Sequence, residues 1–171
     1  RQVSSNKTEQ VEHLIALLKK SPFGKKLIEN STKKIQEFDR SKSLPYFISV
    51  GDTSITDTTL VRHFYPSNPG DVSFESKSRV YISKDLNLQD AILDLAHELV
   101  HFSKRPSTNP YSEYFDLDFY IESTILGEGG EAEAFMAECQ VMKEIFPSRY
   151  NQNENCLQLS LVPKGSLVQR A

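Results

Sequence analysis

The sequence has few of the residues that build several common metal sites, and no long apolar run. Its 171 residues include two cysteines and four histidines. Two cysteines cannot supply four thiolates, so a zinc site made of four cysteines is excluded. No run of about 18 apolar residues occurs, so we expect no transmembrane helix. The length suits one domain with a real core, and we expect a single domain over residues 1–171.

Positive charge is scarce in the half of the chain that holds the candidate site. The net charge is −3, with 14 Lys and Arg against 10 Asp and Glu in residues 1–85, and 6 against 13 in residues 86–171. A nucleic-acid-binding protein should carry a basic stripe near its site. Because this chain shows the reverse, we expect no nucleic acid among its partners.

The first residue and the two cysteines give information on the cellular compartment of the protein. The chain begins at Arg1 rather than at methionine, so a signal peptide could have been removed before this point. Cys139 and Cys156 could form one disulfide in an exported protein, or could be two unpaired thiols. We expect an exported protein, periplasmic or secreted, rather than a cytoplasmic one.

Hydrophobic periodicity predicts a small part made of helices and strands over about residues 8–84. Thr8 can cap a first helix that ends near Lys20, and Pro22 begins a short second helix that ends near Glu29. Gly, Asp, Ser and Pro clusters then separate four expected strands: Lys34–Phe38, Tyr46–Val50, Leu60–Tyr65 and Arg79–Ser83.

The second half is expected to be helical, with the longest helices within about residues 87–146. Asn87 can cap a helix whose apolar residues repeat at helical spacing and which ends before Pro106. A helix or turn follows at about Leu117–Leu126, and glycines separate it from a strong helix over about Glu131–Ile145. A polar tail, residues 147–171, ends the chain. The expected fold class is therefore α+β.

The strongest chemical signal is the sequence HELVH at residues 97–101. Residues four apart lie on one face of a helix, so the imidazoles of His97 and His101 can bind one metal ion. Glu98 can then act as the general base on a zinc-bound water, whose pKa the metal lowers toward neutrality. The apolar positions on the other faces of this helix suit a place in the core. The pattern predicts a zinc-dependent hydrolase.

A catalytic zinc needs a third protein ligand. Metzincins have Gly and His where this chain has Lys104 and Ser107, and peptide deformylases use an upstream cysteine that this chain lacks. The chain resembles the gluzincin branch of the zincin metallopeptidases, whose third ligand is a Glu on a later helix, commonly followed by Ala three residues on. Glu131 and Ala134 match that pattern. The resemblance covers roughly residues 80–146.

Three other carboxylates compete with Glu131 or could support it. Glu133 lies about 200° around the helix from Glu131, so the two cannot face the same ion. Glu138 is two turns on from Glu131 and shares its face, so it could bond a ligand histidine or be a solvated charge. Glu128 precedes the glycine pair and is expected in the turn.

The resemblance also bears on substrate binding. It implies a zincin-like fold, one Zn²⁺ per chain and a peptide or protein substrate. It further implies an edge strand that pairs with extended substrate, for which Arg79–Ser83 is the candidate. An oxyanion-stabilising residue could be any of three tyrosines between the two metal helices, each of which could equally be a core or rim aromatic: Tyr111, Tyr114 and Tyr120.

Three functions are compatible with these residues. The first is a metallopeptidase that hydrolyses peptide bonds with a Glu-activated, zinc-bound water. The alternative is a zinc-binding pseudoenzyme that acts as a protein-binding module, and the third is a metal-free helical domain in which HELVH is a coincidence. The retained Glu98 favours the peptidase, because a purely structural zinc site has no use for that carboxylate.

Overall fold

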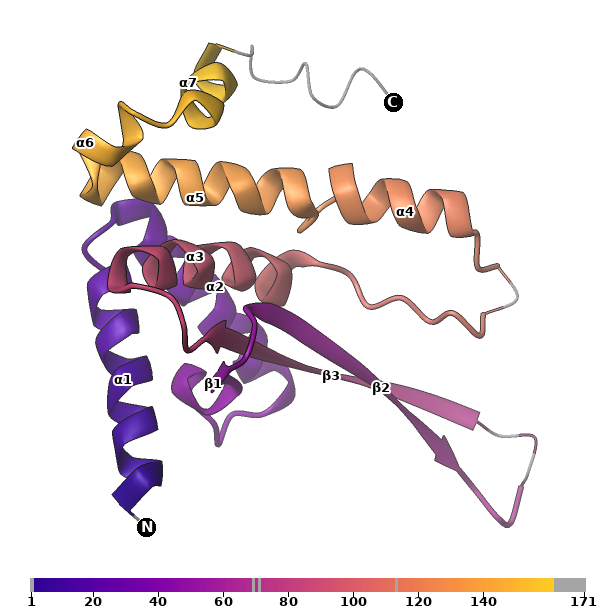
Figure 1. Cartoon of the computed structure of the whole chain (residues 1–171). Coiled ribbons are helices and arrows are strands. Elements are labelled where there is room, and N and C mark those ends of the chain that lie inside the picture. The colour runs from indigo at the N-terminus through magenta and orange to yellow at the C-terminus, as the bar shows by residue number, and fades with distance from the viewer. Residues whose placement is uncertain (1, 69, 71, 113, 162–171) are drawn as a thin grey trace.

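A three-stranded sheet and the helices packed around it make an α+β fold, as the sequence predicted (Figure 1). The structure, a computed structural model, describes residues 2–68, 70, 72–112 and 114–161. No helix in these ranges is long and apolar enough to cross a membrane. The elements in chain order are α1 Gln2–Leu18, α2 Pro22–Phe38, the 3₁₀ helix η1 Leu44–Phe47, β1 Ile48–Gly51, β2 Ile55–Phe64, β3 Val72–Ser83, α3 Leu88–Lys104, α4 Leu117–Leu126, α5 Glu131–Ile145, α6 Pro147–Tyr150 and α7 Glu154–Leu161.

Helix α2 is longer than the sequence predicted and takes the place of one expected strand. Its cap is Ser21, whose hydroxyl accepts a hydrogen bond from the Gly24 amide at 2.8 Å, and Pro22 follows in the first turn. Buried residues then repeat at helical spacing as far as Ile35. The expectation of a strand over Lys34–Phe38 was therefore wrong, because Ile35 completes an apolar stripe that a helix aligns toward the core.

The sheet has the strand order β1-β3-β2, with β3 parallel to β1 and antiparallel to β2. Val80 in β3 is paired with both Ile48 in β1 and Thr56 in β2. Arg79–Ser83 therefore belongs to the central strand, and the expectation that it is an edge open to substrate was wrong. The alternation of apolar and polar residues in a sequence indicates a strand, but it does not reveal which strands lie beside it in the sheet. Among the described strands, the edges are β1 and β2.

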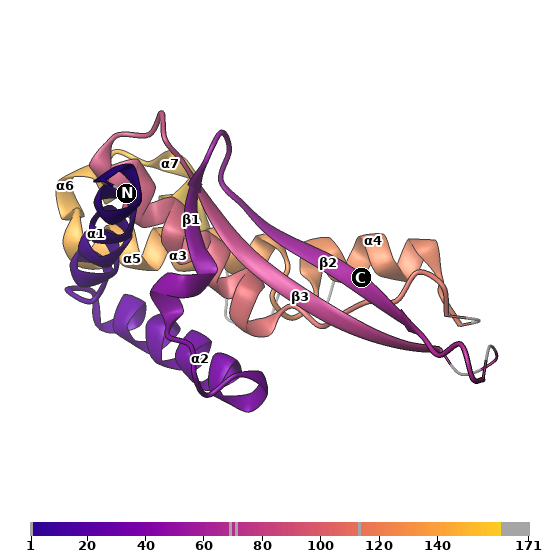
Figure 2. The ribbon, with the colours of Figure 1, turned by 90° about the horizontal axis from the view of Figure 1, so that it is seen from below.

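Helix α3 lies between the sheet and α5 (Figures 1 and 2). The Asn87 side chain caps it, as predicted, by accepting hydrogen bonds from the Gln89 and Asp90 amides at 3.0 and 3.1 Å. Leu95 and Leu99 on α3 are fully buried. Helix α5 has the bounds that the sequence predicted. These two helices carry all the candidate metal ligands.

Two elements extend from the core on the same side, where Figures 1 and 2 both show α4 and the far end of the β2–β3 hairpin. Helix α4 has no buried residue, although it contains several large apolar side chains. Its exposed apolar surface is unusual for a short helix and lies close to the turn that precedes α5.

The expected polar tail is helical over much of its length. Pro147 begins α6, and α7 ends at Leu161, while residues 162–171 of that tail lie outside the described residues. A disulfide joins Cys139 in α5 to Cys156 in α7, which resolves the alternative that the sequence left open. Cys156 is part of the same buried core as Val11 in α1. The disulfide therefore fixes the C-terminal helices to the helix that carries Glu131.

We predict that replacing both cysteines with serine lowers the free energy of unfolding by about 2–4 kcal/mol, because the crosslink restricts the unfolded chain across a separation of 17 residues. Urea unfolding followed by circular dichroism measures the change. Reduced wild-type protein is the matched control and should unfold at the same urea concentration as the variant. Two titratable thiols in native, unreduced protein would contradict the assignment of the disulfide.

Candidate metal centre

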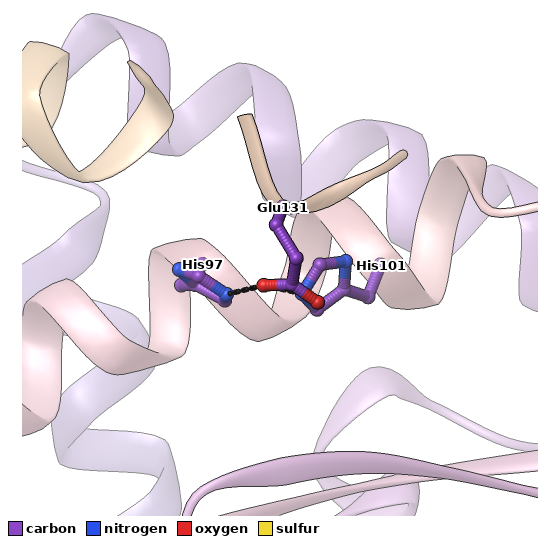
Figure 3. Close-up of side chains that lie close together, drawn as sticks. All are labelled: His97, His101 and Glu131. Carbon is purple, nitrogen blue, oxygen red and sulfur yellow. Dashed lines mark hydrogen bonds and ion pairs between the residues drawn. The ribbon is translucent and has the colours of Figure 1, made fainter. Parts of the chain in front are cut away.

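Three candidate ligands from two helices face one another. His97 and His101 point from α3 toward α5, and the Glu131 carboxylate reaches down from the first turn of α5 to lie between them (Figure 3). One oxygen, Glu131 Oε2, is 3.2 Å from His97 Nε2 and 3.4 Å from His101 Nε2. The sequence predicted these three residues as the ligand set, and the structure brings them together.

The outer nitrogen of each imidazole is occupied by an acceptor. His101 Nδ1 lies 2.7 Å from the backbone carbonyl oxygen of Gly129, and His97 Nδ1 lies 2.5 Å from a carboxylate oxygen of Glu138. A carbonyl oxygen can only accept, so His101 carries a proton on Nδ1, and the Glu138 carboxylate favours the same tautomer of His97. When the rings are neutral, both Nε2 atoms present lone pairs toward Glu131. Pairing a ligand histidine with a carboxylate or a carbonyl in this way is typical of metal sites.

Three acceptor atoms that face one another need a cation among them. Around a tetrahedral zinc, with bonds of about 2.0–2.2 Å, neighbouring ligand atoms lie about 3.3–3.5 Å apart. The distances from Glu131 Oε2 to the two Nε2 atoms, 3.2 and 3.4 Å, are close to this spacing, and all three ligand atoms lie within 4.8 Å of one another. The two imidazoles and one carboxylate are therefore a donor set of the kind that holds a catalytic zinc.

The local charge attracts a cation of either kind, proton or metal. Burial disfavours the protonated form of His97, but the hydrogen bond to Glu138 and the charges of Glu138, Glu98 and Glu131 together raise the pKa of His97 above its usual value. A metal ion must displace that proton. The same carboxylates that favour the proton would favour a divalent ion more strongly, because its charge is twice as large.

Arg105 holds the other oxygen of Glu131, a role that the sequence reasoning did not assign. Its guanidinium donates to Glu131 Oε1 at 2.9 Å and to the Gly129 carbonyl at 3.3 Å. Burial raises the pKa of Glu131, but the Arg105 hydrogen bond and nearby positive charges outweigh it, so the net pKa is lowered. The available signal was spacing, since Arg105 lies one helical turn after His101. Arg105 thus orients Glu131 to offer one oxygen to the histidines.

Glu98 lies beside the ligands and is nearly buried, at 7% exposed. The Thr56 hydroxyl on β2 lies 2.7 Å from Glu98 Oε2 and 2.9 Å from the Glu98 backbone carbonyl, and can donate to one of them at a time. Burial raises the pKa of the Glu98 carboxyl, and the Thr56 hydrogen bond and the two histidines offset this only in part. A raised pKa suits a general base working near neutral pH. No sequence pattern pointed to Thr56. It lies 42 residues before Glu98, and only the packing of β2 against α3 brings the two side chains together.

The turn before α5 packs tightly against the end of α3. Gly129 has a φ of 67°, and a Cβ atom built on it would lie 2.3 Å from the Arg105 backbone nitrogen. Only glycine fits a left-handed conformation at so close an approach. This contact brings the Gly129 carbonyl to His101 and sets where Glu131 begins its helix.

The other predicted residues lie around this centre. Glu133 forms an ion pair with Lys104 and accepts a hydrogen bond from the Gly129 amide at 2.8 Å, so it faces away from the histidines, as expected. Glu128 is exposed in the turn. Tyr111 stacks on Phe74 of the hairpin, and the residue is 78% exposed.

The remaining two tyrosines are also at the surface. Tyr114 is exposed, and Tyr120 packs against Phe115. Within the described residues, no hydrogen bond, ion pair or ring contact joins Tyr111, Tyr114 or Tyr120 to the three ligands. The role of an oxyanion-stabilising tyrosine stays a prediction.

Comparisons of this chain with protein-family models, curated proteins and solved structures found no match. Its function is therefore inferred from the chemistry of the residues described above.

We predict that Glu131→Ala weakens zinc binding by at least about tenfold, because it removes a ligand and leaves Arg105 without its carboxylate partner. Competition with a chromophoric chelator at neutral pH measures the affinity. Glu128→Ala is the matched control, since it removes the same charge from an exposed position in the adjoining turn. Equal losses in the two variants would show that overall charge, rather than ligation by Glu131, governs the affinity.

Proposed function

We propose that the chain is a zinc-dependent metallopeptidase with a zincin-like arrangement of its site. The observation that carries this proposal is the convergence of two Nε2 lone pairs and one carboxylate oxygen beside the buried carboxylate of Glu98. Metal-assisted hydrolysis requires three such ligands, which leave a fourth position for water, and an adjoining base.

His97, His101 and Glu131 would hold the zinc, with Glu138, Gly129 and Arg105 fixing their orientation. Bound zinc would supply a Lewis acid that polarises a carbonyl and lowers the pKa of water. Glu98 would accept the proton of the attacking water and then deliver it to the leaving amine. Its raised pKa favours the first transfer, in which the carboxylate accepts the proton, and Thr56 would keep the carboxylate in place until the second.

A polypeptide is the substrate that the surroundings favour. Strand β2 is an edge of the sheet, and its Thr56 bonds Glu98, so a peptide added along β2 would pass beside the proposed base. A hollow of about 670 Å³ lies between residues 106–116 and α4, next to the turn that leads to Glu131. Aromatic rings line it, and the charged residues among its described lining are all acidic: Asp116, Glu122 and Glu128. An extended chain with apolar and basic side chains would suit this surface.

A zinc-binding pseudoenzyme with a protein-binding role is the second candidate, and the exposed apolar surface of α4 favours it. It accounts less well for Glu98, since burying a carboxylate is costly and a purely structural zinc site has no use for one beside its ligands. Such a protein would bind zinc and a partner without turnover of any protein substrate.

We also propose that the protein is exported. The disulfide between Cys139 and Cys156 supports this, because disulfides persist in oxidising compartments and are rare in the cytosol.

We predict that Glu98→Gln retains zinc and lowers the hydrolysis of an unfolded protein substrate by at least about a hundredfold, since the amide cannot accept a proton. Turnover is followed by mass spectrometry of the fragments, with zinc content measured in the same samples. Glu12→Gln, an exposed change on α1 away from the proposed substrate surface, is the control and should keep both zinc and chelator-sensitive turnover. Near wild-type turnover by Glu98→Gln would rule out this residue as the base, whereas zinc binding without turnover by the wild type would favour the pseudoenzyme.

A further inference from the structure

A second hollow, of about 520 Å³, lies between α2, η1, β3 and the last part of α3. This volume is within the range of small-molecule sites, about 300–1,000 Å³. Its described lining includes four cations, Lys34, Lys42, Lys77 and Arg79, against two carboxylates. The hollow is therefore locally positive in a chain whose net charge is −3.

Both carboxylates of this basic hollow are engaged by other partners. Asp39 accepts hydrogen bonds from the Ser41 amide at 2.9 Å and from the Ser41 hydroxyl at 2.6 Å. Glu75 pairs with His63 at 3.0 Å and with Lys77 at 3.3 Å. Over the described ranges, no ion pair joins the other three cations to a carboxylate: Lys34, Lys42 and Arg79.

Aromatic rings hold these three cations in place without neutralising them. The Lys42 ammonium lies 4.1 Å from the centre of the Tyr46 ring, and the Arg79 guanidinium carbon lies 5.4 Å from the same centre. Two positive charges on one ring repel each other, although each gains from the ring's negative face. The Lys34 ammonium lies 6.0 Å from the centre of the Phe102 ring. An anion between these groups would relieve the repulsion and keep the positions that the rings impose.

Lys34 is half-buried. Burial lowers its pKa, and the charge of Glu37 offsets only part of that effect. A half-buried ammonium without an ion-pair partner is costly, and a bound anion would reduce that cost.

We propose that the basic hollow binds a small phosphorylated molecule. Arginine's planar fork and lysine's point charge both suit phosphate oxygens, and four cations against two carboxylates leave the lining with a net charge of +2. The apolar rings of Phe38 and Phe47 wall the remaining space and would accommodate an organic body. The site shares no residue with the candidate metal centre, so it does not depend on the proposed peptidase.

Isothermal titration calorimetry with pyrophosphate and with inositol hexakisphosphate, at about 0.15 M salt, tests this binding on the whole chain. We expect one saturable site, with the same affinity in metal-free and zinc-loaded protein. Lys42→Gln and Arg79→Gln should each weaken binding by at least about tenfold, because each removes a charge-assisted hydrogen bond. Lys33→Gln and Arg40→Gln are the matched controls, since they remove the same charge from exposed positions outside the hollow.

Two outcomes would overturn the proposal: no saturable binding of either probe, or equal weakening by the control variants. Acetylation footprinting gives a second readout in the unmodified chain, in which the probes should protect Lys34 and Lys42 but not Lys33. Vesicles containing a bisphosphorylated inositol lipid, compared with phosphatidylcholine vesicles, identify the source of the phosphates. Binding to the former that inositol hexakisphosphate displaces would indicate a lipid headgroup, and binding of the free probes alone would indicate a soluble ligand.

Discussion

Two imidazole nitrogens and one carboxylate oxygen face one another in this chain, and the rest of the site depends on that contact. His101 has its other nitrogen committed to the Gly129 carbonyl, and Glu138 holds His97 in the same manner. Without a cation, the three acceptors repel. The contact between α3 and α5 must therefore come from the core, where Ala134 and Ala137 are buried, and from the close approach of Gly129 to Arg105. Packing thus imposes an arrangement that a proton or a metal ion then stabilises.

The charge asymmetry of the sequence separates into two regions of the structure. Glu98, Glu131 and Glu138, all from the acidic half, surround the histidines, and further carboxylates line the hollow beside α4. The basic hollow is built almost entirely from the first half, around Lys34, Lys42 and Arg79. One region is suited to cations and the other to anions, and the net charge of the chain conceals both.

The parts of the site that local pattern determines could be predicted from the sequence. Asn87 and the helical spacing after it fixed the helix that carries His97 and His101, and the glycines before Glu131 marked where the next helix begins. Glu138 could be placed beside the ligands because two helical turns return a side chain to the same face. These inferences need only the geometry of one helix.

What the sequence could not supply was the pairing between distant segments. The alternation of apolar and polar residues over 79–83 marked a strand but not its central position in the sheet. Lys34–Phe38 was misassigned as a strand, because Ile35 belongs to the apolar stripe of α2 only once the buried face of that helix is known. Thr56 acts through a contact with Glu98 that the chain order does not reveal, and the spacing of Arg105 from His101 does not show that its guanidinium reaches Glu131. Each of these depends on tertiary packing, which overrides short-range preference.

The most direct test of the central claim is the position of the metal itself. Crystals of zinc-loaded protein should show an anomalous difference peak at the zinc edge, at one site per chain. We predict that this peak lies about 2.0–2.2 Å from His97 Nε2, His101 Nε2 and one oxygen of Glu131. A peak beside other residues, or the absence of any peak when zinc is supplied in excess at neutral pH, would contradict the account.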